Sequence, residues 1–244
     1  MNYYKEEHRL PSNGVLEDLV HDVVTLRNMT TAEEKMLLGS SGEKVFDTMI
    51  KECVVSPEDL DLGDLLTADK HFIIIKLRVL SFGSEYPVTY SHSCGDTSEY
   101  MLNLEELPVH YLPDDFVEPY DEFKLPVNGD TIALKIPRNR DIEFINKKVK
   151  RFKKKFPSAK GDISYIYRLA SNIHSINGEE QSDTEKESYM SNLHSKDSSY
   201  IKHRIGKLEV GIDTTIITEC NGCGEDIEFE LPFNESFFRS RFDD

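Results

Sequence analysis

The sequence predicts an α+β fold: a small β knuckle region formed by both halves of the chain, with a helical block inserted between its strands. A Cys-x-x-Cys turn, from Cys220 to Cys223, leads at once into an alternating strand pattern. A weaker copy of this pattern surrounds Cys94, far upstream. Between the two copies, residues 141–205 carry apolar side chains at helical spacing. Two such knuckles can close on one metal ion and so tie distant parts of the chain together.

Composition limits the function classes. The 244 residues carry a net charge of -16, which argues against general affinity for nucleic acid. No apolar run reaches the roughly 18–20 residues of a membrane span. The first residues lack the apolar core of a signal peptide, so we expect the protein to stay in the cytoplasm where it is made. Four cysteines in such a chain indicate metal binding or inert thiols before disulfides.

We expect one compact unit with three parts. Residues 1–136 form an α+β part with the first knuckle, residues 137–206 form the helical insertion, and residues 207–244 form the last strand and the second knuckle.

The first part begins with a turn at residues 10–14 and a strand at residues 23–26. The residues T-T-A-E-E at positions 30–34 offer a capping box, a threonine hydroxyl with a glutamate three residues on, for a short helix that ends near Leu38. A second helix starts near Ser41 and places Cys53 on its apolar face, where a packed thiol is expected.

Residues 65–80 are nearly all apolar and predict a buried helix. Arg78 within this helix is expected at the surface, paired with an acid. Short strands at residues 88–90 and 101–104 flank the first knuckle. Residues 107–124 predict a loop packed by Tyr111, Phe116 and Tyr120, and residues 131–136 alternate as a strand.

In the insertion, Asp141 can cap a helix that Pro157 ends, and its apolar stripe has spacings typical of an amphipathic helix. Lys160 and Gly161 link it to a helix over residues 163–176. A third helix runs to about Ile205 and buries Asp197, which would need Arg168 or Arg204 as its partner. Residues 208–217 then form the strand before the second knuckle.

The candidate metal ligands are Cys220, Cys223, Cys94 and His92, for one Zn²⁺. A Cys-x-x-Cys turn presents two thiolates to one ion, and a glycine after the second cysteine lets backbone N–H groups point at the sulfurs. The first copy has Ser91 where the second has Cys220, so the fourth ligand is either His92, the candidate replacement, or a more distant group. The alternative is a knuckle that keeps its fold without the metal. A redox role is disfavoured because a strand, not a helix, follows the motif.

A basic run predicts a binding surface on the first helix of the insertion. Seven of nine consecutive residues are positive: Lys147, Lys148, Lys150, Arg151, Lys153, Lys154 and Lys155. The leading interpretation is docking on an acidic surface, of a partner or of this chain; nucleic-acid binding is the alternative.

Aromatic residues near the C-terminus divide into two groups. Phe237 is expected to pack in the core, and Phe238 and Phe242 are expected to be exposed contacts for a partner. The sequence contains no glycine-rich phosphate loop, zinc-protease motif or nucleophile elbow, so we expect a protein that is not an enzyme.

Several segments, in order, resemble the baseplate hub subunits and hub assembly proteins of T4-type contractile-tailed bacteriophages. They are L-P-S-N-G at residues 10–14, D-K-H-F-I-I-I-K-L-R-V-L-S-F-G-S-E-Y at residues 69–86, N-L-H-S-K-D at residues 192–197, and C-N-G-C-G-E-D-I-E-F-E-L-P-F-N-E-S-F-F-R at residues 220–239.

The resemblance implies a protein that helps to assemble or build the hub in the host cytoplasm, or that stays in the virion tail, with other hub proteins as its partners. A homo-oligomer is a further option, and no membrane is implied. Relatives often carry two Cys-x-x-Cys-Gly knuckles, and that pattern transfers here to Cys94, Cys220 and Cys223. The alternative function is a zinc-ribbon-like nucleic-acid-binding or regulatory protein that uses the basic helix.

Overall fold

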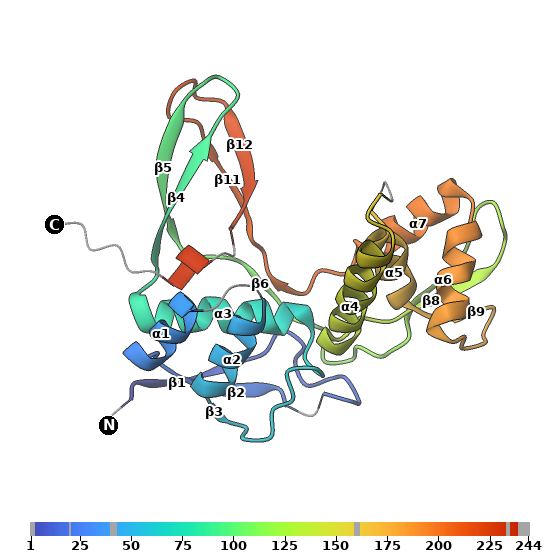
Figure 1. Cartoon of the computed structure of the whole chain (residues 1–244), viewed down its shortest axis with the longest axis horizontal. Helices are drawn as coiled ribbons and strands as arrows, with labels where there is room; N and C mark the ends of the chain where they lie inside the picture. Colours follow the sequence, from blue (N-terminus) through green and yellow to red (C-terminus); the bar gives the residue numbers. More distant parts are fainter. Residues whose placement is uncertain (1–2, 20, 40–42, 159–161, 233–234, 239–244) are drawn as a thin grey trace.

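A sheet and three helices form the base of the molecule, two β-hairpins rise from it as a tower, and a second lobe of helices and strands lies to one side (Figure 1). The computed structural model describes residues 3–19, 21–39, 43–158, 162–232 and 235–238. The mixture of helices and small sheets confirms the predicted α+β class.

The first lobe packs helices against a three-stranded antiparallel sheet of order β1-β2-β3. Its elements are β1 (Lys5–Arg9), β2 (Val23–Arg27), α1 (Thr31–Gly39), α2 (Glu43–Cys53), β3 (Val54–Ser56) and α3 (Thr67–Phe82). The predicted strand and helices are therefore present, and the Ser41 start of α2 lies outside the described residues. The Cys53 side chain is fully buried, as predicted.

Helix α3 is the centre of this lobe because its apolar run packs on several elements at once. Phe72, Ile73, Ile75 and Leu77 are buried, which confirms the helix that the sequence predicts there. The prediction for Arg78 is wrong. Its guanidinium is buried and donates to the carbonyls of Gly83 and Glu85, at 2.9 and 3.3 Å, and so closes the turn after the helix.

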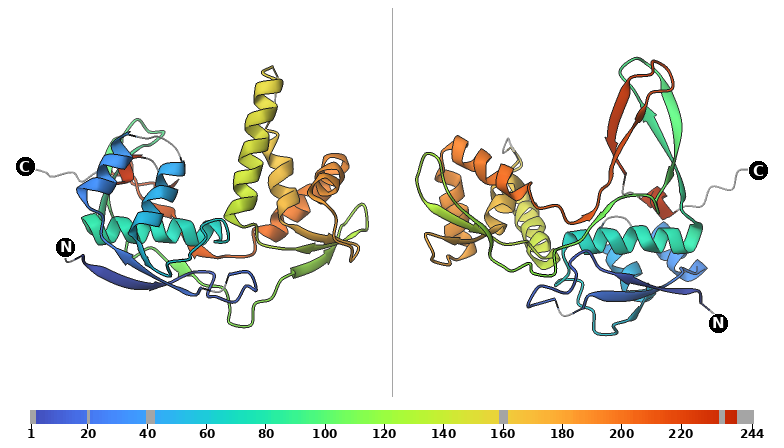
Figure 2. Two further views of the ribbon diagram at one scale, coloured as in Figure 1. Left: turned by 60° about the horizontal axis from the view of Figure 1, so that its bottom comes forward. Right: turned by 180° about the vertical axis from the view of Figure 1, so that it is seen from behind.

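The tower consists of two antiparallel hairpins from distant parts of the chain. They are β4 (Glu85–Ser91) with β5 (Thr97–Asn103), and β11 (Thr215–Glu219) with β12 (Asp226–Glu230). The views in Figures 1 and 2 agree that the hairpins stand side by side. The Tyr90 and Phe229 rings stack between them with centroids 4.8 Å apart. Below them, β6 (Val109–His110) pairs with β10 (Gly211–Ile212).

The second lobe has its own apolar cluster and a sheet of order β7-β8-β9. Its elements are β7 (Tyr120–Lys124), β8 (Thr131–Leu134), α4 (Asn139–Lys155), α5 (Ser164–Ser171), β9 (Ile173–Ile176), α6 (Asp183–Asn192) and α7 (Ser195–Ile205). Phe123, Ile132 and Leu134 pack with residues of the helices. The division of the chain at residues 137 and 207 stays a proposal.

Several predictions about residues 107–205 are wrong. The loop expected over residues 107–124 contains β6 and β7; Phe116 and Tyr120 pack as predicted, with ring centroids 5.7 Å apart, but Tyr111 is 44% exposed. The helix expected over residues 163–176 ends at Ser171, and the chain continues as β9. The expected third helix is two helices, α6 and α7. The Lys160–Gly161 link lies outside the described residues.

Asp197 is fully buried, as its position on the apolar line implies, but its partners are not arginines. Its carboxylate accepts hydrogen bonds from the backbone N–H groups of Val127 and Asn128, both at 2.9 Å. Arg204 instead pairs with Asp121. The buried acid therefore fixes the β7–β8 turn against the start of α7.

After β12 the chain returns to the base. The short 3₁₀ helix η1 (Glu235–Phe238) brings Phe237 and Phe238 into the first core. Phe237 is buried, as predicted; Phe238 is 1% exposed and tilts against Phe46, so its expected exposure is wrong. Two aromatic anchors from the end of the chain thus close the core, and Phe242 lies outside the described residues.

Candidate metal centre

The four predicted ligands lie together at the top of the tower, in the turns of the two hairpins. His92 and Cys94 come from the β4–β5 turn, and Cys220 and Cys223 come from the β11–β12 turn. Residues far apart in the chain therefore converge at one point, which is the central expectation from the sequence.

Both turns are shaped by a glycine after the last cysteine. Gly95 has a φ of 93° and Gly224 has a φ of 73°, backbone values that other residues rarely adopt. The Gly95 N–H donates to the carbonyl of His92 at 3.0 Å, and the Gly224 N–H donates to the carbonyl of Cys220 at 2.8 Å. Each glycine N–H thus closes its knuckle on the first ligand, three residues back at His92 and four residues back at Cys220, so the second turn is one residue longer.

The ligand atoms of the four residues all lie within 4.8 Å of one another. Cys94 Sγ is 3.7 Å from Cys220 Sγ, and Cys223 Sγ is 3.4 Å from His92 Nδ1. Tetrahedral zinc places two sulfurs about 3.8 Å apart and a sulfur and an imidazole nitrogen about 3.5 Å apart. The donor set could hold one metal ion, and its spacing is compatible with Zn²⁺.

The sulfurs have opposite protonation tendencies. The backbone N–H groups of Cys223 and Gly222 help to lower the pKa of Cys220 to about 7. The Glu225 N–H lowers the pKa of Cys223, but desolvation and the neighbouring Cys220 and Cys94 sulfurs outweigh it and raise this pKa to about 11. A bound cation would relieve that repulsion, because a metal ligates cysteine as the thiolate.

Ser91 does not take the fourth ligand position. Its hydroxyl lies 2.9 Å from the Thr97 hydroxyl, within the β4–β5 hairpin. The His92 Nε2 atom is 3.3 Å from the Ser93 hydroxyl, while Nδ1 faces Cys223. The one-residue offset between the copies therefore brings His92, and not Ser91, to the cluster.

No sequence pattern marks three residues that support the site: Asp96, Tyr100 and Gly222. Asp96 accepts a hydrogen bond from the Ser98 hydroxyl at 2.7 Å and lies 3.9 Å from Cys220 Sγ. A Cβ atom on Gly222 would lie 2.6 Å from the Asp96 Cβ, so the turns touch here. The Tyr100 hydroxyl accepts the Asn221 N–H at 3.2 Å. These contacts hold the two turns together beside the ligand cluster, and only the assembled tower reveals them.

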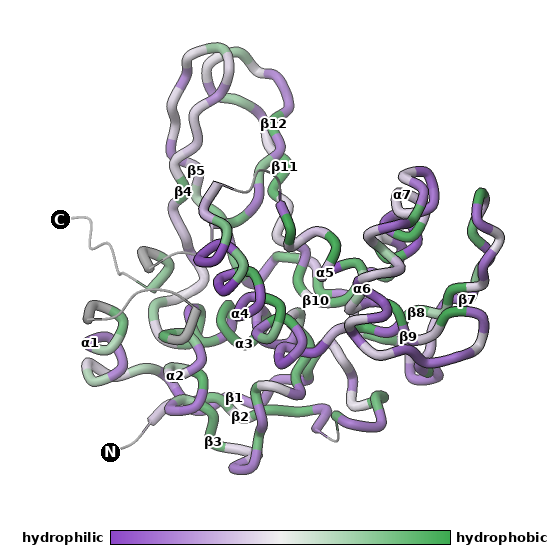
Figure 3. Tube along the Cα trace, turned by 45° about the vertical axis from the view of Figure 1, so that its right-hand side comes forward, coloured by the Kyte–Doolittle hydropathy of each residue, from purple (hydrophilic) through white to green (hydrophobic). Residues whose placement is uncertain are grey.

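The predicted basic surface is on α4, well away from the metal cluster (Figure 1). The hydropathy colours alternate along this helix in Figure 3, as expected for an amphipathic helix. Lys147 pairs with Glu143 at 3.4 Å, and Lys148 pairs with Glu187 at 2.5 Å. Among the described residues, the other five basic side chains take part in no ion pair: Lys150, Arg151, Lys153, Lys154 and Lys155.

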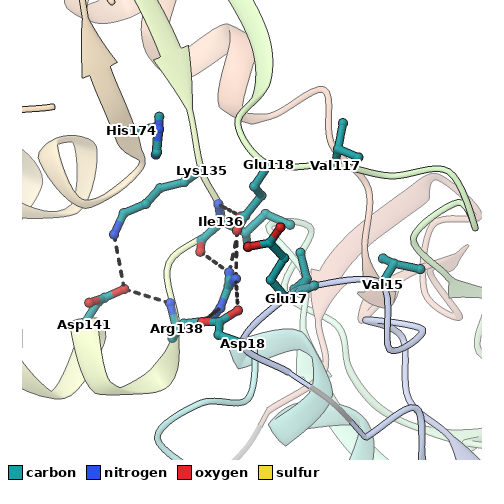
Figure 4. Close-up of a pocket in the computed structure, with 11 residues that line it drawn as sticks. Val15, Glu17, Asp18, Val117, Glu118, Lys135, Ile136, Arg138, Asp141 and His174 are labelled. Atoms are coloured by element: carbon teal, nitrogen blue, oxygen red, sulfur yellow. Dashed lines mark hydrogen bonds and ion pairs between the residues drawn. The ribbon is translucent and has the colours of Figure 1, made fainter. Parts of the chain in front are cut away.

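A pocket of about 380 Å³ lies where the two lobes meet (Figure 4). Arg138 crosses it and donates to Asp18 and Glu118, with shortest distances of 2.7 and 2.8 Å. Lys135 faces Asp141 at 3.9 Å. The two cations of the pocket are thus paired with acids of its lining, and the described lining residues include no serine, cysteine or threonine nucleophile.

A comparison with protein families matches residues 1–239 to the model described as T4 bacteriophage base plate protein. No curated protein and no solved structure matches the chain. Within the described residues, no helix has the length and apolar character needed to cross a membrane.

Proposed function

Because the chain belongs to the family of T4 bacteriophage base plate proteins, we propose that it serves the hub of a phage tail baseplate by docking onto other proteins. It acts there as an assembly factor or as a structural subunit, and it makes and breaks no covalent bond. Its partners are other hub proteins. It works in the host cytoplasm during assembly, and a structural subunit would remain in the virion tail.

The observation that carries this proposal is the way in which the start of α4 is attached to the first lobe. At its start, the Asn139 and Arg140 N–H groups donate to the carbonyls of Leu65 and Gly63, both at 2.9 Å. The Asn139 side chain also donates to Leu62 at 3.0 Å. The left view of Figure 2 shows the other end projecting beyond its neighbours. A helix fixed at its base and basic at its free end suits the positioning of another subunit.

We further propose that the knuckle cluster binds one Zn²⁺. The metal would be held by Cys94, Cys220, Cys223 and His92, and it would supply a cross-link between the hairpins. Metal analysis of protein purified without chelator should give close to one zinc per chain. Less than about 0.2 zinc per chain would contradict the proposal, since a structural site of this kind is nearly filled when metal is present.

Replacement of Lys153, Lys154 and Lys155 by alanine tests the docking function. We expect weaker association with purified baseplate proteins in co-sedimentation, and no change in a DNA gel shift. Loss of DNA binding with intact protein association would favour the nucleic-acid-binding or regulatory alternative.

Mass spectrometry of purified virions separates the role of assembly factor from that of structural subunit. An assembly factor would be missing from the finished particle, and a structural subunit would be present.

A further inference from the structure

The basic residues of α4 fall into two groups by position. Lys147 and Lys148, in the middle of the helix, are paired with acids of this chain. The five that follow are exposed, and no described acid lies within ion-pair distance of them. The lobe therefore uses the first group for its own packing and leaves the second group available to a partner.

An apolar groove lies beside these five charges. Phe152 and Phe156 have ring centroids 4.9 Å apart, and Phe156 is 47% exposed. Together with Lys155, Pro157 and Ser158 they line a groove of about 430 Å³. The aliphatic stem of Lys155 and its cation–π contact with Phe156, at 5.4 Å, place a positive charge on the edge of the groove.

Charge restricts what can occupy this groove. Seven of the 29 basic residues lie between Lys147 and Lys155, which leaves 22 basic and 45 acidic residues, a balance of -23, in the rest of the chain. An acidic partner is repelled by that remainder and attracted only to the end of α4, so the charge distribution selects both the site and the orientation.

We infer that the far end of α4 binds an acidic segment of a different protein, which places one apolar side chain in the groove, against Phe152 and Phe156. The surrounding lysines and Arg151 face the carboxylates of that segment. This inference rests on the proposed docking function and gives the chemistry of the partner. A second copy of this chain is disfavoured because two chains that each carry a net charge of -16 repel each other.

The test measures binding of fluorescent probes to the full-length chain at low salt. The probes are a short glutamate-rich peptide with one central phenylalanine, the same peptide with serine there, single-stranded DNA of equal charge, and vesicles containing phosphatidylserine. We expect the phenylalanine peptide to bind about tenfold tighter than the serine peptide, as burial of one aromatic ring implies.

Two variants assign the effect to the groove and the charges. Phe156→Ser should remove the preference for phenylalanine and keep residual binding of both peptides. The pair Lys150→Glu and Lys154→Glu should weaken both peptides at least tenfold. The matched control is Lys5→Glu with Lys35→Glu, two exposed residues of the first lobe with the same charge change; both peptides should bind it as they bind the unchanged chain.

Equal binding of the two peptides, tighter binding of DNA or vesicles, or no binding of any probe would overturn the inference. So would self-association of the unchanged chain in sedimentation that the Lys150→Glu, Lys154→Glu pair abolishes. Co-sedimentation with baseplate proteins separates the two proposals. If the charge-reversed pair still co-sediments, docking uses another surface and the proposed function stands. If the unchanged chain does not co-sediment, the proposed function itself fails.

Discussion

Glu33 shows how one carboxylate can both cap a helix and pair with a half-buried arginine. It accepts hydrogen bonds from the Thr30 N–H and hydroxyl, both at 2.7 Å, and from Arg27 at 2.9 Å. The capping box predicted over residues 30–34 is therefore present, and the structure identifies Thr30 and Glu33 as its pair. Arg27 was not predicted as its partner, because it lies on β2 and reaches Glu33 only in the folded lobe.

The Arg27 guanidinium lowers the pKa of Glu33 from 4.5 to about 2. The ionised form is thus favoured in the folded state, and its stabilisation is present above pH 4.5 and lost as the pH falls toward 2. At pH 7, Glu33→Gln should lower the free energy of unfolding by about 1.5–3 kcal/mol. The loss should shrink between pH 4.5 and pH 2, as measured by denaturant titration.

Glu34→Gln is the matched control, since it makes the same change one residue further along the same first turn. It removes only an interaction with the helix dipole, so it should cost less than about 1 kcal/mol. A Glu33→Gln loss that is equally large at pH 3 would contradict the assignment to an ionised carboxylate.

Gly222 is the residue through which the two knuckles touch. An alanine Cβ would lie 2.6 Å from the Asp96 Cβ, so Gly222→Ala must push the turns apart. We expect about 1–3 kcal/mol of destabilisation and about a tenfold loss of zinc affinity in chelator competition. Gly206→Ala is the control, because its nearest neighbour is the Lys202 carbonyl oxygen at an ordinary 3.5 Å. Equal effects at the two glycines would contradict this prediction.

At the scale of elements, sequence periodicity was sufficient where one helix buries one face. α4 is the example, because Ile145 of its apolar stripe is buried although the far end of that stripe, at Phe156, is 47% exposed. The same rule failed for residues 173–176, whose isoleucines continue the helical spacing of α5. Ser171 and Asn172 bond the Arg168 carbonyl, at 2.8 and 2.7 Å, and end the helix. Residues 173–176 then pair with β8 as a strand. The apolar spacing of a segment does not show which strand will pair with it.

The candidate metal site also has a part that the sequence predicts and a part that only the folded structure shows. The repeated cysteine–glycine turns predict that Cys94, Cys220 and Cys223 meet, because a shared local pattern survives in the sequence. The contact of Asp96 with Gly222 depends on how two hairpins lean together, so only the assembled tower shows it. The burial of Phe238 could not be predicted either, because nothing in the sequence distinguishes a buried aromatic residue near the chain end from an exposed one.

Arg138 is the link between α4 and the first lobe. Its side chain is 8% exposed and forks between Asp18 and Glu118 (Figure 4). Arg138→Lys keeps the charge but cannot bond Asp18 and Glu118 at the same time as the guanidinium does. We therefore expect the free energy of unfolding to fall by about 2–4 kcal/mol. Hydrogen exchange should rise at the start of α4. Arg140→Lys, whose side chain is 57% exposed, should change stability by less than about 1 kcal/mol. An unchanged exchange rate at the start of α4 would mean that Arg138 does not hold this helix against the first lobe.

At the scale of the whole molecule, the knuckle cluster joins segments that the chain separates widely. Cys94 and Cys220 are 126 residues apart, and the entire second lobe lies in the loop between them. A cross-link that closes a loop of this size restricts the unfolded chain strongly, by on the order of 4–5 kcal/mol in the chain-entropy model. The hairpins have a second connection at their base, where Tyr86 packs on Phe237 with ring centroids 4.9 Å apart.

Metal removal should therefore loosen the top of the tower and leave both lobes folded. With zinc bound as proposed, chelation should lower the free energy of unfolding by on the order of 2–5 kcal/mol. Hydrogen exchange should increase in residues 92–96 and 220–225, and stay unchanged in α3 and α4. Cys220→Ser should reproduce this pattern without chelator, and Cys53→Ser should retain full zinc content because Cys53 lies in the first core. Exchange that rises equally throughout the chain would show that the cluster holds the whole fold; no change at the turns would show that aromatic packing alone holds the tower.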